Sequence, residues 1–260
     1  MVVLSGGQDS VTCLFWAKQE YGRVEALSVD YGQKHAIELK AARKVAELAG
    51  VPFEVVPVHN ILRGNSPLTN PTVPLEKYEN YPQMDAVIGD RVEVTFVPMR
   101  NAFFLTLAAN YAFVREIRTL VTGVCGQDNA NYPDCRQPFI TSQQETINLA
   151  LGIDDFEIVT PLMKLSKGET VKLAVEIPGA YAALAFSHTS YNGEYPPTDK
   201  NHSNVLRAHG FEEADVPDPL VLRAFREGLI KALPDSQNYR QELVAKFAAL
   251  LPEQISSLTQ

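Results

Sequence analysis

The sequence lacks the features that mark a secreted, disulfide-stabilised or membrane-spanning protein. Its 260 residues include only three cysteines, Cys13, Cys125 and Cys135, and this number cannot make a paired disulfide framework. No apolar run is long enough to cross a bilayer, and no signal peptide precedes the first polar turn. We therefore expect a protein of the reducing cytoplasm that makes no membrane contact.

Clustered positive charge is also absent. The net charge is −8, and no run of lysine or arginine interrupts the chain. This balance argues against a nucleic-acid partner, which requires many cations to neutralise its phosphates, although a local basic pocket for phosphate is still compatible with it. Hydrophobic residues make up 45% of the chain, without internal repeats or low-complexity tracts. That content is enough for one sizeable α/β domain.

A glycine-rich turn stands between the apolar residues 1–4 and a helical pattern over 11–21. We call it the phosphate loop, and it consists of Ser5, Gly6, Gly7, Gln8, Asp9 and Ser10. Two glycines let the backbone approach an anion, and the helix start adds free N–H groups and a positive dipole end. Asp9 can hold a Mg²⁺ that bridges phosphates. The loop lacks the Gly-Lys-Ser/Thr of a Walker A motif and the third glycine of a dinucleotide fingerprint. The alternative is a plain glycine turn with a serine cap.

Strand and helix patterns alternate after this loop. The predicted strands cover 23–30, 53–58, 119–124 and 156–160, and the predicted helices cover 34–49, 102–114, 139–151 and 167–175. The alternation predicts an open parallel sheet with helices on both faces. We expect a nucleotide-binding domain over 1–187 and a C-terminal loop and helical region over 188–260. An amphipathic pattern over 240–251 predicts a last helix that either covers the domain or makes a dimer contact.

Polar side chains follow several of these strands, where an open parallel sheet binds its ligands. Asp30 and Tyr31 suit the ribose and adenine of a nucleotide, unless they only end a strand at a glycine turn. Arg100 precedes a helix, where a guanidinium can meet a carboxylate or phosphate. Lys167 near a helix start could reach pyrophosphate, or could be solvated surface. Residues 61–90 form a long, proline-containing stretch, which we interpret as a lid or substrate flap, or else as a solvated insertion.

Seven segments together resemble the 7-cyano-7-deazaguanine synthase family, over roughly residues 1–211. In order they are Ser5–Ser10, Asp30–Gln33, Phe96–Asn101, Gly123–Cys125, Tyr132–Arg136, Thr160–Met163 and Tyr191–Gly193. The resemblance implies a Rossmann-like PP-loop ATP pyrophosphatase fold and an ATP-dependent C–N ligase of queuosine biosynthesis. It implies that 7-carboxy-7-deazaguanine is adenylated, that ammonia gives an amide, and that a second activation dehydrates the amide to a nitrile.

The motifs and the resemblance together give three expected sets of site residues. The set for ATP is Ser5, Gly6, Gly7, Gln8, Asp9, Ser10, Asp30, Tyr31 and Gly123. The set for the deazaguanine acid is Phe96, Arg100, Asn101, Asp128, Tyr132, Asp134 and Arg136. The catalytic set is Asp9, Ser10, Arg100 and Lys167. The expected partners are small molecules and a second copy of the chain, and the expected cofactors are ATP and Mg²⁺.

The chain departs from the family pattern at a structural zinc site. The family carries four cysteines there, and the matching positions are Ser190, Thr198, Asn201 and Asn204. Hydroxyl and amide groups hold Zn²⁺ poorly, so we expect no structural zinc. A substitute site built from Asp199, His202 and His209 is the alternative, although their spacing fits no usual zinc pattern.

Two further departures lie beside presumed ligand contacts. Gly126 stands where the family usually has glutamate, and Met99 stands where it usually has glycine. They leave open a diverged enzyme that stops at the amide or transfers the activated deazaguanine to an amine on a protein partner, as in phage or antiviral defence. A non-catalytic nucleotide-binding protein is the remaining alternative. Cys125 and Cys135 match the family, and we assign them no catalytic role.

Overall fold

A five-stranded parallel sheet forms the centre of the computed structural model, which describes residues 1–32, 37–59, 61–62, 64–70, 72–125 and 131–248. The strand order is β3-β2-β1-β4-β5, and every neighbouring pair is parallel. The strands are β1 (Val2–Val3), β2 (Ala26–Asp30), β3 (Phe53–Pro57), β4 (Thr119–Thr122) and β5 (Glu157–Val159). Parallel strands need crossover connections, and helices supply them here.

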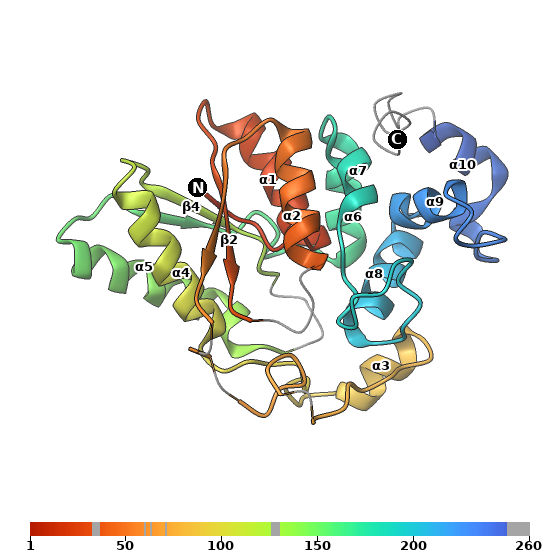
Figure 1. The fold of residues 1–260 in the computed structure, drawn as a ribbon, viewed down its shortest axis with the longest axis horizontal. Coiled ribbons are helices and arrows are strands. Elements are labelled where there is room, and N and C mark those ends of the chain that lie inside the picture. The colour runs from red at the N-terminus through yellow and green to blue at the C-terminus, as the bar shows by residue number, and fades with distance from the viewer. Residues whose placement is uncertain (33–36, 60, 63, 71, 126–130, 249–260) are drawn as a thin grey trace.

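Helices cover both faces of this sheet. One face packs against α1 (Gln8–Glu20), α2 (Ile37–Ala49), α6 (Lys167–Glu176) and α7 (Ala180–Ala183), and the other against α4 (Arg100–Phe113) and α5 (Gln137–Leu151) (Figure 1). Each face has its own hydrophobic core, with Leu14 and Val171 in the first and Leu105 and Ile140 in the second. The structure confirms the predicted doubly covered parallel sheet.

The stretch 61–90 contains a helix that the sequence pattern did not reveal. This helix, α3 (Tyr81–Ile88), has Met84 fully buried and packs against Val205 and Leu206 of α8 (His202–Glu213). The solvated insertion that the sequence left open is therefore wrong, because an apolar cluster anchors the stretch. The lid or substrate flap stays a prediction.

The chain after residue 187 packs on the sheet domain. Its helices are α8, α9 (Pro219–Arg226) and α10 (Gln241–Ala248). Phe211 of α8 lies in the same core as α1 and α6, and Phe247 of α10 places its ring 5.3 Å from the ring of Tyr181. The predicted helix 240–251 was expected either to cover the domain or to make a dimer contact. Phe247 covers the domain. Leu250 and Leu251 lie outside the described residues. The domain boundary at 187 and the homodimer stay predictions.

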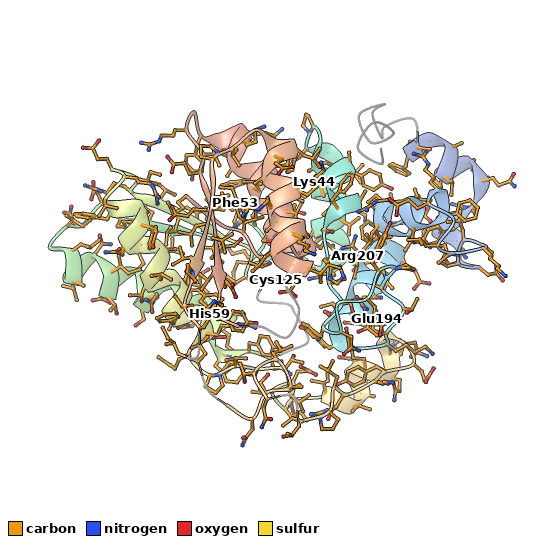
Figure 2. The ribbon with its side chains drawn as sticks, in the orientation of Figure 1. Lys44, Phe53, His59, Cys125, Glu194 and Arg207 are labelled. Carbon is orange, nitrogen blue, oxygen red and sulfur yellow. The ribbon has the colours of Figure 1, made fainter. Side chains whose placement is uncertain are left out.

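The strand order changes direction between β1 and β4, since β2 and β3 extend from one side of β1 and β4 and β5 from the other. In open α/β sheets the crevice at such a switch point, beyond the carboxyl ends of the strands, is where ligands bind. Figure 2 shows Cys125, just after β4, near the middle of the molecule between His59 and Arg207. No helix in the described part of the chain is long and apolar enough to cross a membrane.

Candidate active site

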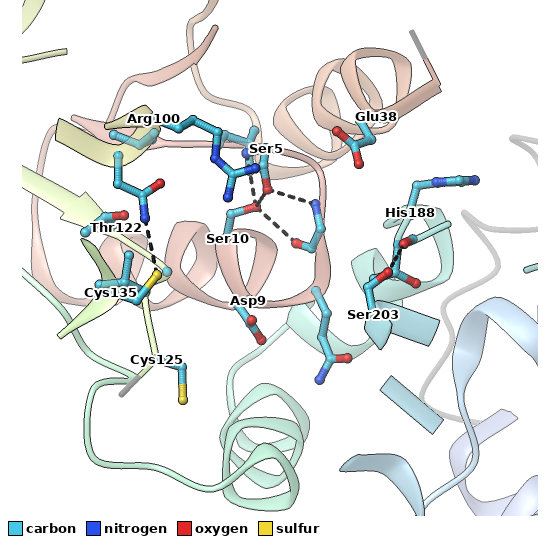
Figure 3. A pocket seen from close by; sticks show the side chains of 18 of the residues that line it. Ser5, Asp9, Ser10, Glu38, Arg100, Thr122, Cys125, Cys135, His188 and Ser203 are labelled. Atoms are coloured by element: carbon cyan, nitrogen blue, oxygen red, sulfur yellow. Dashed lines mark hydrogen bonds between the residues drawn. The ribbon is translucent and has the colours of Figure 1, made fainter. Parts of the chain in front are cut away.

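The phosphate loop is held by its own hydrogen bonds at the end of β1. The two serine hydroxyls lie 3.0 Å apart, the Gly7 amide donates to Ser5 Oγ at 3.2 Å, and Ser10 Oγ donates to the Gly7 carbonyl at 3.0 Å (Figure 3). Gly7 is the N-cap of α1 and has no side chain, so the first amides of this helix are available to an anion. The loop is preorganised as an anion cradle.

Close packing explains two of the glycines around this loop. Gly6 has φ +87°, and a Cβ there would lie 2.4 Å from the Glu38 carbonyl oxygen of α2. At Gly123, after β4, a Cβ would lie 2.9 Å from the Ser10 nitrogen. Backbone therefore packs directly on backbone at the switch point, which only glycine permits.

Asp9 and Lys167 bring the starts of α1 and α6 together. Lys167 Nζ donates to Asp9 Oδ2 at 2.7 Å, and the two side chains are 11% and 21% exposed for lysine and aspartate respectively. A capping box between Ser166 and Glu169 fixes the start of α6. Lys167 is therefore not solvated surface, because its side chain lies against α8 and its ammonium faces a carboxylate of the phosphate loop.

One cavity of about 310 Å³ joins the phosphate loop to polar and aromatic side chains from other elements. Arg100, the first residue of α4, points into it (Figure 3). Burial raises the pKa of Tyr31, also in the lining, and the nearby Arg100 guanidinium opposes that shift. A volume of this size is at the lower end for small-molecule sites.

The start of α4 is tied to a 3-10 helix, η1 (Pro133–Cys135). Met99, the N-cap residue, makes no side-chain cap, and the Asp134 carboxylate accepts instead from the Asn101 amide at 3.2 Å. The Asn101 side chain donates to the Asp134 carbonyl at 3.0 Å and to Cys135 Sγ at 3.2 Å. Burial raises the pKa of Asp134, and the Asn101 amide opposes it. Asp134 thus positions Arg100 and Asn101 from behind the cavity.

Three further predicted residues also lie behind or outside the lining. The ring of Phe96 lies 5.4 Å from that of Tyr132, which does line the cavity, so Phe96 supports this wall. Asp30 accepts from the Gly32 amide at 3.1 Å, and Arg136 donates to the Asn131 carbonyl at 3.3 Å on the surface. Neither side chain reaches the cavity lining.

The structure gathers most of the predicted site residues around this one cavity. Those that line it are Ser5, Gly7, Gln8, Asp9, Ser10, Tyr31, Arg100, Asn101, Gly123, Tyr132 and Lys167. Those placed elsewhere are Gly6, Asp30, Phe96, Asp134 and Arg136. Asp128 and Gly126 lie outside the described residues.

Several lining residues were not assigned to the site by the sequence reasoning, and three of them are titratable groups close to the phosphate loop or Arg100. Glu38 projects from α2, where burial raises its pKa to about 7 and Arg100 opposes the shift. His188 donates its amide to the Gly6 carbonyl at 2.8 Å. His202 of α8 is buried, and this burial lowers its pKa to about 4, so its ring is neutral. The only available signal was an acidic residue in the first helical turn at Glu38, since a sequence does not show which helix face meets a cavity.

Two buried polar groups in the lining make no hydrogen bond to the described residues. The first is the side-chain amide of Gln8, through both its Nε2 and its Oε1 atoms, and the second is the His202 ring, through Nε2. Gln8 is 2% exposed and His202 is 3% exposed. Buried polar groups in native proteins almost always have a partner, in the protein or in solvent or ligand. The cavity therefore presents hydrogen-bonding groups that suit a polar occupant.

Comparisons with known proteins agree with this geometry. The profile of the family described as "Queuosine biosynthesis protein QueC" matches residues 1–215. A 7-cyano-7-deazaguanine synthase of Chromobacterium violaceum is 48% identical over 231 residues, covering 87% of this chain and 94% of that protein. Its counterpart in Laribacter hongkongensis is 45% identical, covering 86% and 94%. Among solved structures, a 4-thiouridine synthetase–RNA complex with bound ATP aligns with 98% of this chain and 53% of its own, at 16% identity and a TM-score of 0.42. The chain belongs to the QueC family.

Proposed function

We propose that this chain is an ATP-dependent ligase that converts 7-carboxy-7-deazaguanine and ammonia into 7-cyano-7-deazaguanine. The observation that carries the proposal is the single cavity in which the phosphate loop, the Asp9–Lys167 pair and Arg100 meet. The curated relatives, which share nearly their whole length with this chain, are named 7-cyano-7-deazaguanine synthases and support this product. Nothing in the described cavity or in these relatives favours a product that stops at the amide.

The first step in this proposal activates a poor acylating group. The substrate carboxylate attacks the α-phosphorus of ATP, pyrophosphate leaves, and an acyl adenylate forms. The amides at the start of α1 and the hydroxyls of Ser5 and Ser10 bind the phosphates, and Lys167 neutralises charge on the leaving pyrophosphate. Arg100 is charged at every working pH and its planar fork suits the substrate carboxylate.

Asp9 fits a role in holding Mg²⁺. Its carboxylate lines the cavity beside the anion cradle and pairs with the Lys167 ammonium at 2.7 Å. Mg²⁺ in nucleotide sites is commonly held by one or two carboxylates, with phosphates and waters completing its shell. When bound, the ion would draw charge from the phosphates as the leaving group forms.

The remaining steps exchange oxygen for nitrogen. Ammonia attacks the acyl carbon, AMP leaves, and a proton is lost to give the amide. The amide oxygen then attacks the α-phosphorus of a second ATP and pyrophosphate leaves. Loss of AMP and of both N–H protons gives the nitrile. The residues present bind and orient the reactants, because no protein nucleophile is required by this sequence of steps.

The product assay tests the proposal. The full chain is incubated with 7-carboxy-7-deazaguanine, ATP, Mg²⁺ and ammonia, and the products are identified by mass spectrometry. We expect the nitrile, with about two AMP released per nitrile because each activation consumes one ATP. Accumulation of the amide, or of a deazaguanine adduct on a protein, contradicts the proposal.

Asp9→Asn separates catalysis from folding in the same assay. This change keeps the shape of the side chain and removes its charge, so we expect AMP formation to fall by at least about 100-fold with an unchanged circular dichroism spectrum. Asp155→Asn is the matched control, because Asp155 is a surface carboxylate that is 64% exposed. Normal turnover in Asp9→Asn would remove Asp9 from the proposed metal role.

A further inference from the structure

The positions that match the family's zinc ligands are already engaged in hydrogen bonds. Ser190 Oγ accepts from the amides of Asn192 and Glu194, both at 3.2 Å, and Thr198 Oγ1 donates to Glu194 Oε2 at 3.0 Å. Hydroxyl and amide groups are poor ligands for Zn²⁺, which takes thiolate, imidazole and carboxylate. The donor set here does not fit zinc.

The substitute site considered from the sequence is not assembled either. The part of the chain that the structure describes contains no group of three or more histidine, cysteine, aspartate or glutamate side chains arranged for a metal. His209 stacks on the ring of Tyr81 with centroids 3.6 Å apart, and His202 is buried facing the cavity. Asp199, the third candidate, makes different contacts.

Asp199 is the centre of a hydrogen-bond network of side-chain amides. Its Oδ2 accepts from Asn201 Nδ2 at 2.5 Å and from Asn192 Nδ2 at 3.2 Å, and its Oδ1 accepts from Asn204 Nδ2. Asn204 Nδ2 also donates to the Asp199 carbonyl at 3.0 Å. Two of these three amides occupy positions where the resemblance implies a zinc thiolate. A carboxylate has about four lone-pair sites, so it can gather several donors around one point, and charge strengthens each bond.

The same network reaches the wall of the cavity. Asn201 caps α8 by accepting from the Asn204 amide at 3.1 Å, and Asn204 Oδ1 accepts from Thr189 Oγ1 at 2.8 Å. Ser203 Oγ donates to the Thr189 carbonyl (Figure 3). Thr189, Ser190 and Tyr191 all line the cavity. The conformation of this wall therefore depends on side chains that Asp199 orients.

We propose that the Asp199 carboxylate takes the structural place of a metal ion in this chain, and that Asp199 is a positioning residue for the cavity wall formed by residues 189–191. A tetrahedral zinc would hold four ligands around one cation, and here three amides converge on one anion. The site is independent of zinc, and its integrity determines how well the wall meets the deazaguanine acid. The kinetic part of this proposal rests on the proposed function.

Metal content and chelation form the first arm of the test. The full chain, purified without added metal, is analysed for zinc, and its activity and amide hydrogen exchange over 188–204 are measured before and after dialysis against a chelator. We expect less than about 0.1 zinc per chain and no change beyond about twofold after dialysis. One tightly bound zinc per chain, or faster exchange after chelation, overturns the proposal.

Asp199→Ala forms the second arm, and Asp215→Ala is its matched control. Asp215 is an exposed carboxylate paired with Arg240 at 3.2 Å, away from the network. In Asp199→Ala we expect the KM for the deazaguanine acid to rise by at least about tenfold, the KM for ATP to change by less than about twofold, and exchange over 188–204 to accelerate. A merely structural residue would lower Tm and leave the KM of the folded fraction unchanged, and that result overturns the positioning role.

Asp199→Asn keeps the test decisive if the alanine variant does not fold. It retains one accepting oxygen and loses the charge, so we expect an intermediate rise in KM and an intermediate acceleration of exchange. If Asp199→Asn matches the wild type in both, the carboxylate is not the centre of the network and the proposal is wrong. Should the wild type not turn over the deazaguanine acid at all, the proposed function fails while the exchange and zinc measurements still decide the role of Asp199.

Discussion

The phosphate loop and the segment 188–204 border the same cavity but are held in place by different means. The phosphate loop combines hydrogen bonds of its own serine hydroxyls with a close backbone contact to α2, since a Cβ at Gly6 would meet the Glu38 carbonyl oxygen at 2.4 Å. The segment 188–204 depends on side-chain amides around Asp199. Backbone contact admits almost no substitute, whereas a side-chain network can change its chemistry as long as the wall stays in place. From this contrast we expect substitutions at the glycines of the phosphate loop to be more damaging than substitutions in the segment 188–204.

The largest effect is expected from Gly6→Ala, which disrupts the backbone contact between the phosphate loop and α2. The new Cβ adds both a clash with α2 and a strained φ of +87°, so we expect the free energy of unfolding to fall by more than about 4 kcal/mol. Urea denaturation measures it. Two control glycines separate the causes, because Gly50 has φ +65° with nothing within 4 Å, and Gly22 has neither feature.

These controls define what would contradict the prediction. Gly50→Ala carries strain alone and should cost about 1 kcal/mol, and Gly22→Ala should change stability by less than about 0.5 kcal/mol. If Gly6→Ala costs no more than Gly50→Ala, the contact between the phosphate loop and α2 is not tight and the contrast between the two regions weakens.

The next largest effect belongs to the C-terminal region. The Arg207 guanidinium meets the Asp218 carboxylate in two hydrogen bonds, of 2.5 and 2.8 Å, and these side chains are only 2% and 6% exposed. Asp218→Ala leaves a buried guanidinium without its counter-ion, so we expect a loss of about 3–5 kcal/mol in the free energy of unfolding, measured by urea denaturation. Asp215→Ala, which breaks an exposed pair, should cost less than about 0.5 kcal/mol. Equal effects would show that the buried pair does not anchor α8 to α9.

The same contrast shows how much a sequence can predict. The order of strands and helices and the place of the cavity follow from apolar periodicity and from the topology of parallel sheets. Asp9, Arg100 and Lys167 could therefore be assigned to one site from their positions in the sequence, and they do line one cavity. Helix α3 was missed because it is short and surrounded by prolines.

The roles of individual side chains were harder to predict. Asp134 was expected to bind substrate, and the structure adds a bond from its carboxylate to the start of α4 that the sequence did not show. Glu38 was not expected in the site although it faces the cavity. Both depend on how a helix is rotated and on contacts between residues far apart in the sequence. The hydrogen bonds of Asp199 likewise join residues from a loop and a helix start, and no local pattern encodes them.

Glu38→Gln should give a smaller and pH-dependent effect. The folded-state pKa of Glu38 is raised by burial to about 7, from an ordinary value of 4.5, so the folded protein binds the proton more tightly than the unfolded chain. Wild-type stability therefore falls as pH rises from about 4.5 through 7. Glutamine mimics the protonated form, so we expect the variant to exceed the wild type by about 1–2 kcal/mol at pH 8, after discounting for partial solvent exposure, and to match it at pH 5.

Thermal and urea denaturation at the two pH values test this difference. Glu47→Gln is the control on the same helix, because Glu47 is 60% exposed and should show little difference between pH 5 and pH 8. A Glu38→Gln variant whose advantage is the same at both pH values would show that ionisation of Glu38 is not the cause.

The smallest effect is expected at Met99, where the resemblance described above implies glycine. Met99 has φ +64° and is 68% exposed, so it is strained but buries little surface. Relief of the strain contributes about 1 kcal/mol and the greater freedom of glycine in the unfolded chain offsets part of it, so Met99→Gly should stabilise by about 0.5 kcal/mol in urea denaturation. Met99→Ala keeps the strained dihedral and should change stability by less than about 0.3 kcal/mol. A stabilisation of equal size in both variants would assign the effect to the methionine side chain. If only Met99→Gly stabilises the protein, glycine is favoured at position 99 because of the backbone dihedral alone. At Gly6, by contrast, glycine is required because a Cβ would collide with the backbone of α2.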